Sequence, residues 1–169
     1  MIISRTPVRV SFCGGGTDLP AYYIDSENGG LVTSMALAKH IHVTVNKRFD
    51  SSVRVSYSKT EIVKDFEDLE HELVREAMRI TGVTQSVEIT TIADIPSRGT
   101  GLGSSSALTV GLLNALHTFA GRNPDAAQLA DEACQIEIDI LGQPIGRQDQ
   151  YASAFGGSNQ IAFMPDDSV

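Results

Sequence analysis

The stretch Ile95–Leu113 reads IPSRGTGLGSSSALTVGLL, with three alternate glycines followed by three consecutive serines. Glycine is unfavourable inside a helix and serine competes with the helix for backbone hydrogen bonds, so this cluster belongs at a helix start. The apolar run that follows predicts a helix over residues 104–121, ended by Gly121. Backbone N–H groups at that start lack intrahelical partners and the helix dipole adds positive potential, which favours a bound phosphate.

The same glycines allow a second interpretation, a plain strand-to-helix turn with a serine cap, and the sequence leaves it open. A Walker A loop is excluded because no lysine follows Gly103. A dinucleotide-binding fingerprint fits poorly, because these glycines come late and follow an antiparallel-looking sheet. Hydroxyl groups of the serines could add donors or a ligand for magnesium.

The rest of the chain alternates strand-like and helix-like runs in an order typical of an α+β domain. Apolar alternation predicts strands over residues 1–13, 29–37, 40–48, 51–58, 86–94 and 159–163. Helical spacing predicts further helices over 66–82, with Gly82 as a stop, and over 123–142, with Asn123 as N-cap. The N-terminal strands favour a mostly antiparallel sheet with packed helices.

Length and composition favour one domain that works on a small ligand. The chain has 169 residues and a formal net charge of −8, which argues against a broad nucleic-acid surface. No window approaches the about 18 apolar residues of a membrane span, and the N-terminus does not resemble a signal peptide, so we expect a cytoplasmic protein without a membrane partner. Cys13 and Cys134 match no metal spacing, and we expect buried, reduced thiols.

Three segments together resemble the successive motifs of a known family. They are PVRVSFCGGGTD (Pro7–Asp18), IPSRGTGLGSSSA (Ile95–Ala107) and GQPIGRQDQYASAFGG (Gly142–Gly157). In this order they resemble the GHMP kinases, the sugar and metabolite kinases grouped with galactokinase, homoserine kinase, mevalonate kinase and phosphomevalonate kinase. Within that family, GGGTD resembles the D-glycero-D-manno-heptose 7-phosphate kinases, and fucose kinases share a related variant.

The resemblance implies a two-layer fold like domain 2 of ribosomal protein S5, and an N-terminal, ATP-binding domain over residues 1–169. Complete members of the family are about twice as long and carry a second domain. We therefore expect the C-terminal domain to be missing from this chain, and this piece alone to be inactive. The alternatives are a fucokinase- or galactokinase-like sugar kinase, or a sugar- or nucleotide-binding module of the same fold without catalysis. The oligomeric state is not predicted.

The implied reaction is transfer of the γ-phosphoryl group of ATP to a sugar hydroxyl, with Mg²⁺. Asp149 matches the family's catalytic aspartate, and Arg9 matches a basic residue placed near it, where an Arg–Asp contact would keep the carboxylate ionised. A helix-capping aspartate and a solvated strand arginine are the plain alternatives. The residues that match the nucleotide-binding motif are Pro96, Arg98, Gly99, Gly101, Leu102, Gly103, Ser104, Ser105 and Ser106.

The glycine-rich end of the first motif matches the sugar-binding segment of the family, here Gly15, Gly16, Thr17 and Asp18. Gly15 and Gly16 replace an acid and a histidine of the galactokinase pattern, so two known sugar contacts do not carry over. A bulkier or phosphorylated sugar suits that space, and the likeness implies phosphorylation of heptose 7-phosphate at its anomeric hydroxyl to the 1,7-bisphosphate. A turn aspartate is the alternative for Asp18.

A magnesium site is implied by a matching glutamate, Glu137, acting together with Ser105 of the phosphate loop. Oxygen ligands suit Mg²⁺, which takes few protein groups and keeps several waters. Spacing alone does not decide between Glu137 and Asp139, and both could equally lie on the exposed face of a helix.

Overall fold

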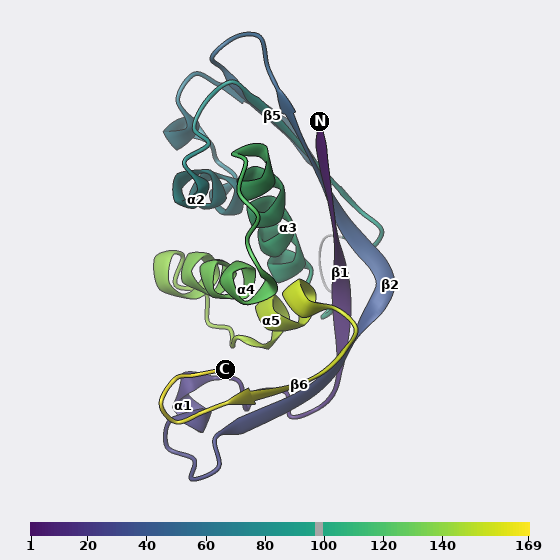
Figure 1. Ribbon diagram of the computed structural model, residues 1–169, viewed down its shortest axis with the longest axis vertical. Helices are drawn as coiled ribbons and strands as arrows, with labels where there is room; N and C mark the ends of the chain where they lie inside the picture. The colour runs from purple at the N-terminus through teal and green to yellow at the C-terminus, as the bar shows by residue number, and fades with distance from the viewer. Residues whose placement is uncertain (97–99) are drawn as a thin grey trace.

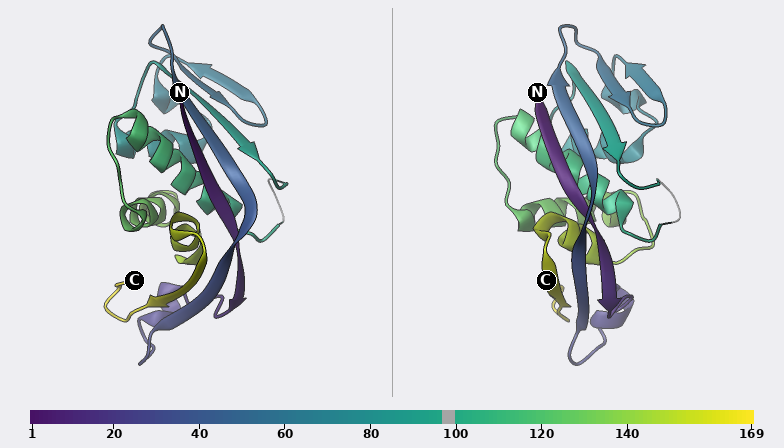
Figure 2. Two further views of the ribbon diagram at one scale, coloured as in Figure 1. Left: turned by 45° about the vertical axis from the view of Figure 1, so that its right-hand side comes forward. Right: turned by 90° about the vertical axis from the view of Figure 1, so that its right-hand side faces the viewer.

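The computed structural model describes residues 1–96 and 100–169 and is organised around one long strand, β2 (Gly30–Lys47). β1 (Ile2–Cys13) runs antiparallel along one edge of β2. On its other edge β2 pairs with β6 (Ser158–Phe163) near its start and with β5 (Val87–Ala93) near its end. Figure 2 shows β1 and β2 running side by side over most of the length of the molecule.

The prediction of two strands over 29–37 and 40–48 is wrong, because both runs belong to β2. The register shifts where the two runs meet: Pro7 pairs with His40, whereas Arg9 pairs with Ala36. Three residues of β2 therefore lie opposite the single residue Val8 of β1. Such a bulge lets a strand bend without ending.

The remaining strands extend the sheet beyond β5. β3 (Val53–Ser56) lies parallel to β5. β4 (Thr60–Val63), which was not predicted from the sequence, lies antiparallel to β3. Among the described strands, β3 and β5 form the one parallel pair. The mostly antiparallel α+β fold is confirmed.

The main helices cover one face of the sheet and so form the second layer (Figure 1). They are α2 (Glu72–Thr81), α3 (Ser104–Phe119), α4 (Ala126–Cys134) and α5 (Gln148–Phe155). α3 packs against β1 and β2, and most of its side chains are buried. The core between the layers includes Val43, Val45, Ile89, Leu112 and Leu116, all 0% exposed. Burial of this apolar surface is the main driving force for the fold.

Several helix ends differ from the prediction. The run 66–82 divides into a 3₁₀ turn, η1 (Phe66–Asp68), and α2, while Gly82 ends α2 in the left-handed conformation as predicted. Asn123 is not the N-cap of the next helix. Asp125 takes that place and accepts a hydrogen bond from the N–H of Gln128 at 2.8 Å, as aspartate at an N-cap does.

The last part of the chain returns to the start of β2, where β6 and the short helix α1 (Pro20–Tyr23) lie near each other (Figure 1). Tyr23 stacks on Phe163 with ring centroids 6.0 Å apart. Cys134 is buried as expected, whereas Cys13, at the end of β1, is exposed, which corrects that prediction. Among the described residues, no helix is both long and apolar enough to span a bilayer.

Candidate active site

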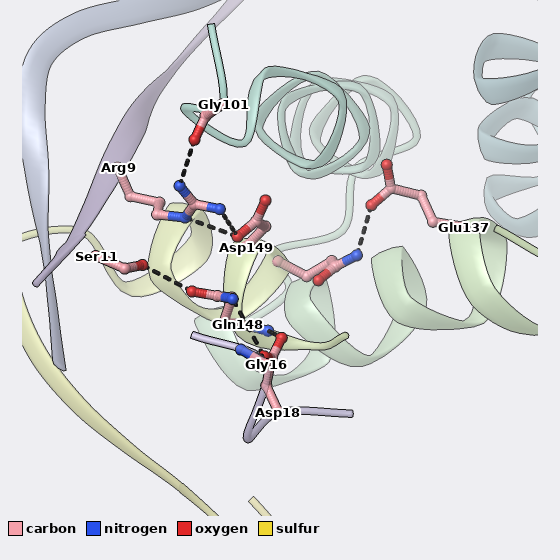
Figure 3. Close-up of polar contacts among 9 residues, drawn as sticks. Arg9, Ser11, Gly16, Asp18, Gly101, Glu137, Gln148 and Asp149 are labelled. Carbon is pink, nitrogen blue, oxygen red and sulfur yellow. Dashed lines mark hydrogen bonds and ion pairs between the residues drawn. The ribbon is translucent and has the colours of Figure 1, made fainter. Parts of the chain in front are cut away.

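The first strand and the fifth helix meet at an ion pair between Arg9 and Asp149 (Figure 3). Arg9 donates from Nε to Asp149 Oδ1 at 2.7 Å, and its Nη2 contacts the same oxygen. Its Nη1 donates to the carbonyl oxygen of Gly101 at 2.8 Å. The guanidinium group therefore joins the predicted catalytic carboxylate to the predicted phosphate loop.

The backbone of Arg9 also holds that loop. Beside the β-bulge, the N–H of Arg9 donates to the carbonyl oxygen of Leu102 at 3.1 Å. Both the main chain and the side chain of one strand residue thus contact the segment that precedes α3. This arrangement places the loop directly over the start of α5.

The Asp149 carboxylate lies against the first residue before α3. A Cβ atom built on Gly103 would lie 2.9 Å from Asp149 Oδ2, and Gly103 has a φ of +71°. Only glycine meets both demands without strain. Burial raises the pKa of Asp149 above its ordinary value, and the nearby positive charge of Arg9 opposes that rise.

The start of α3 lacks a side-chain cap. Gly103 is the N-cap residue, no side chain accepts from the first turn, and the serine cap of the plain alternative is therefore not formed among the described residues. Ser104 and Ser105 line a cavity of about 530 Å³, together with Pro96. These are the features expected of an anion site at a helix N-terminus. Arg98 and Gly99 lie outside the described residues.

The far part of this cavity is aromatic and apolar. Tyr57 and His71 line it, and their rings meet edge to face with centroids 4.6 Å apart. Burial lowers the pKa of His71, which favours the neutral imidazole. Ile92 and Leu108 add apolar surface. The cavity therefore joins polar groups at α3 to a compartment lined by aromatic and apolar side chains.

The glycine turn after β1 is fixed by Thr17 and Asp18. The Thr17 hydroxyl donates to the carbonyl oxygen of Gly14 at 2.7 Å and accepts from the N–H of Leu31 at 3.0 Å, which ties the turn to β2. Asp18 is only 2% exposed. Gly15 and Gly16 are exposed, as a turn open to a ligand requires.

A smaller cavity of about 270 Å³ lies between this turn and α5. Its lining includes Arg9, Gly16, Asp18, Gln148 and Asp149. Thus two of the four predicted sugar-binding residues reach the same cavity as the predicted catalytic pair. Thr17 does not line it, and its hydroxyl is already engaged by the backbone.

The predicted metal-binding glutamate is fully buried in a π-helical turn, η2 (Gln135–Ile140), between α4 and α5. Gln150 Nε2 donates to Glu137 Oε2 at 2.7 Å. Burial raises the pKa of Glu137, while the neighbouring groups of Ser106, Gln150 and Ser105 favour its charged form. Asp139 is exposed, so the geometry favours Glu137 of the two acids.

One oxygen of this glutamate and two buried oxygens of its neighbours have no hydrogen-bond partner among the described residues. They are Glu137 Oε1, Ser106 Oγ and Gln150 Oε1. Buried polar atoms are normally satisfied, so unpaired ones indicate a place for water or an ion. A set of carboxylate, hydroxyl and amide oxygens suits Mg²⁺. The residues present therefore fit the implied metal, with Ser106 joining Ser105 as a candidate.

Sequence reasoning missed Ser11, Gln148 and Gln150. Ser11 lies two residues after Arg9, and alternation along a strand places both side chains on one face, which was a usable signal. Gln148 and Gln150 flank Asp149 in the sequence QDQ. Neighbouring helix residues point in different directions, so no pattern in the sequence indicates what each would meet.

Known proteins resemble this chain over nearly its whole length. The family described as GHMP kinases N terminal domain matches residues 61–157. The chain belongs to the GHMP kinases. This membership confirms the resemblance to the family. The second and third motifs lie wholly within the matched residues, and the first precedes them.

Two of its similar relatives are sugar kinases. A D-glycero-alpha-D-manno-heptose 7-phosphate kinase from Campylobacter jejuni is 34% identical, with 96% of this chain and 50% of the relative covered. An L-fucokinase/L-fucose-1-P guanylyltransferase from Bacteroides fragilis is 27% identical, with 93% of this chain and 20% of the relative covered.

The fold is also that of a solved kinase. The crystal structure of a D-glycero-D-manno-heptose 1-phosphate kinase from Bacteroides thetaiotaomicron superposes with a TM-score of 0.91 at 28% identity, covering 99% of this chain and 58% of that one. The chain thus spans about half the length of the Campylobacter relative and 58% of the solved chain.

Proposed function

We propose that this chain is the N-terminal, ATP-binding domain of a sugar kinase that phosphorylates the anomeric hydroxyl of D-glycero-D-manno-heptose 7-phosphate. One observation carries the proposal: the Asp149 carboxylate, held by Arg9, lies against the uncapped start of α3. A proton acceptor and an anion site are thereby adjacent, which is what phosphoryl transfer to a hydroxyl requires.

The nucleotide is assigned to the larger cavity. Backbone N–H groups at the start of α3, with the hydroxyls of Ser104 and Ser105, would hold the phosphates of ATP. The base would lie toward Tyr57 and His71, whose uncharged rings suit a flat heterocycle. Gly101 and Leu102 take part through their carbonyl oxygens, which keep the loop on Arg9.

The smaller cavity is assigned to the sugar. Asp149 would accept or orient the proton of the attacking hydroxyl, and its raised pKa makes it a better base than an ordinary aspartate. Arg9 keeps the carboxylate ionised and places positive charge where the transferring group would pass. The open turn at Gly15 and Gly16 leaves room for a large or phosphorylated sugar.

Magnesium would be held by Glu137 with Ser106, each of which has a buried oxygen that lacks a partner among the described residues, or with the exposed hydroxyl of Ser105. Bound there, the ion supplies positive charge that neutralises the phosphate oxygens of the nucleotide. The protein's own contribution is to keep these oxygens in a dry, shaped site, with Gln150 holding one oxygen of the glutamate in place.

The substrate assignment rests on the motifs and on the relatives. The heptose phosphate kinases among them favour a heptose phosphate, and the fucokinase relative keeps a free sugar as the alternative. The whole protein would carry a C-terminal domain that completes the site, so this domain alone is expected to be inactive. A cytoplasmic location, and the lack of nucleic-acid and membrane partners, stay predictions.

The direct test is a phosphorylation assay with the protein as its gene encodes it. Heptose 7-phosphate, heptose 1-phosphate, fucose and galactose are compared as acceptors of phosphate from ATP. The proposal expects the highest kcat/KM for heptose 7-phosphate, with the bisphosphate as product. A higher kcat/KM for fucose or galactose would instead assign the protein as a fucokinase or a galactokinase. ATP binding without transfer to any of these sugars would favour a binding module.

A further inference from the structure

Gln148, the residue before the proposed base, lines the smaller cavity and bonds to two other parts of its wall (Figure 3). Its Oε1 accepts from the hydroxyl of Ser11 at 2.7 Å, and its Nε2 donates to Asp18 Oδ1 at 3.1 Å. Its backbone N–H donates to Asp18 Oδ2 at 3.1 Å. One residue therefore joins β1, the glycine turn and α5.

The orientation of this amide is fixed by its partners. An ionised carboxylate can only accept hydrogen bonds, so the nitrogen of the amide must face Asp18. The amide oxygen then faces Ser11, whose hydroxyl donates to it. One N–H and one lone pair of Gln148 have no protein partner among the described residues, and the side chain is only partly buried.

Asp18, by contrast, has little capacity left. Its Oδ1 accepts from the N–H of Gly16 at 3.0 Å as well as from Gln148, and its Oδ2 accepts from the backbone of Gln148. Three of the about four acceptor sites of a carboxylate are therefore used. The backbone of Gly146 is packed against the remaining side, since a Cβ atom there would lie 1.9 Å from Oδ2.

We infer that Gln148, rather than Asp18, is the residue that forms hydrogen bonds with the sugar. Asp18 and Ser11 are positioning residues that fix the orientation of the Gln148 amide. The free N–H and the free lone pair of one amide match an adjacent acceptor and donor, as two neighbouring sugar hydroxyls provide. This inference rests on the proposed function, because it takes the smaller cavity as the acceptor site.

The test replaces Gln148 with methionine, which keeps length and removes both hydrogen-bonding groups. Affinity for heptose 7-phosphate, measured by calorimetry, and its KM should weaken about 10- to 100-fold, the effect of two hydrogen bonds, while ATP affinity is unchanged. Gln128→Met, on the exposed face of α4, is the matched control and should change neither.

Sugar analogues that each lack one hydroxyl distinguish a direct contact between Gln148 and the sugar from a purely structural role of Gln148. The loss caused by Gln148→Met should be clearly smaller for each analogue that lacks one of the two hydroxyls bound by the amide, and should persist in full for the other analogues. Ser11→Ala, which frees the amide to turn, should give a smaller loss of the same pattern. Equal losses for every analogue, or an unchanged sugar affinity, would overturn the inference.

The proposed function fails on a different observation. If the natural protein binds these sugars but transfers no phosphate, the kinase assignment falls, whereas the binding pattern still tests Gln148. If none of the sugars binds to the wild-type protein, the inference is overturned as well.

Discussion

Two helix starts form the candidate site, and they differ in how far the protein satisfies its own polar groups. At α5, the backbone N–H of Gln148 is bound by Asp18, and the Asp149 carboxylate is bound by Arg9. At α3, no side chain caps the first turn, and the buried hydroxyl of Ser106 has no partner among the described residues.

The start of α5 is therefore preorganised by contacts within the protein, whereas the start of α3 has polar groups left for a ligand to bind. Groups already bound within the protein need not reorganise during reaction, which is how enzymes stabilise developing charge. Unsatisfied groups cost stability in the free protein and are normally avoided. The unpaired group at the start of α3 is therefore a sign of a ligand there, whereas Gln148 and Asp149 at the start of α5 are already bound within the protein and form a catalytic framework. Further along α5, Gln150 Oε1 and Ser153 Oγ also lack a partner among the described residues.

Among the variants that keep the carboxylate itself, removing its partner Arg9 should have the largest effect. Arg9→Ala leaves Asp149 buried without its positive neighbour, which raises the pKa of Asp149 further, and it also frees the carbonyl oxygen of Gly101. In the full-length protein we expect kcat to fall about 10²- to 10³-fold, with the remaining activity shifted to higher pH. Steady-state kinetics across pH measure both. An unchanged rate with an unchanged pH profile would contradict the role of Arg9.

The contact between the two helix starts can be broken at Gly103. In Gly103→Ala the new methyl group would collide with Asp149, and alanine would be held in the left-handed backbone conformation. We therefore expect a loss of about 1–2 kcal/mol in the free energy of unfolding. ATP binding should be weaker and phosphate transfer slower. Urea unfolding and calorimetry measure these effects.

Gly121→Ala is the control for Gly103→Ala. Gly121 has a φ of +79° with nothing within 4 Å of an added Cβ, so it carries the same backbone strain without the contact. It should lose similar stability and keep its ATP affinity. Equal effects of the two variants on ATP binding would show that the contact is unimportant.

The unsatisfied hydroxyl at α3 predicts a smaller effect, of opposite sign on stability. Ser106→Ala removes a buried group without a partner, so the free energy of unfolding should stay equal or rise by up to about 1 kcal/mol, while magnesium and ATP bind more weakly. Ser4→Ala, which removes another buried and unpaired hydroxyl on β1, should show the stability change alone. If Ser4→Ala weakened the binding of magnesium and ATP as much as Ser106→Ala does, the proposed role of Ser106 in the ligand site would be contradicted.

The smallest expected effect concerns the two cysteines. Cys13 is exposed beside the glycine turn, whereas burial raises the pKa of Cys134 to about 12, which leaves it as an unreactive thiol. A thiol reagent should therefore modify one cysteine of the folded protein quickly, and mass spectrometry of Cys13→Ser should show that this site is lost. Rapid modification of Cys134 would contradict its burial.

Much of the fold could be predicted from local patterns. Strand alternation, the apolar run of α3 and the left-handed stop at Gly82 are properties of neighbouring residues, and the structure confirms them. The continuity of β2 could not be predicted in the same way. It depends on the pairing with β1 across the bulge near Arg9, which is not a local property.

The candidate site shows the same limit. The residues of the three motifs suggested Arg9, Asp18 and Asp149, and the structure brings them to one cavity. Three contacts in the site were not predicted: Gln148 donates to Asp18, Ser11 donates to Gln148, and Gln150 donates to Glu137. They depend on how β1, the glycine turn and η2 pack around α5. Sequence spacing does not contain that information. The roles of all these residues in a reaction stay predictions.

The most direct test of the central claim is the rate of phosphate transfer by Asp149→Asn in the full-length protein, measured beside its ATP affinity. Because asparagine keeps the shape and can still accept from Arg9, the variant should fold and bind ATP as the wild type does, while kcat falls about 10²- to 10⁴-fold. A folded variant that binds ATP and transfers phosphate at the wild-type rate would contradict the claim that this carboxylate serves as the base.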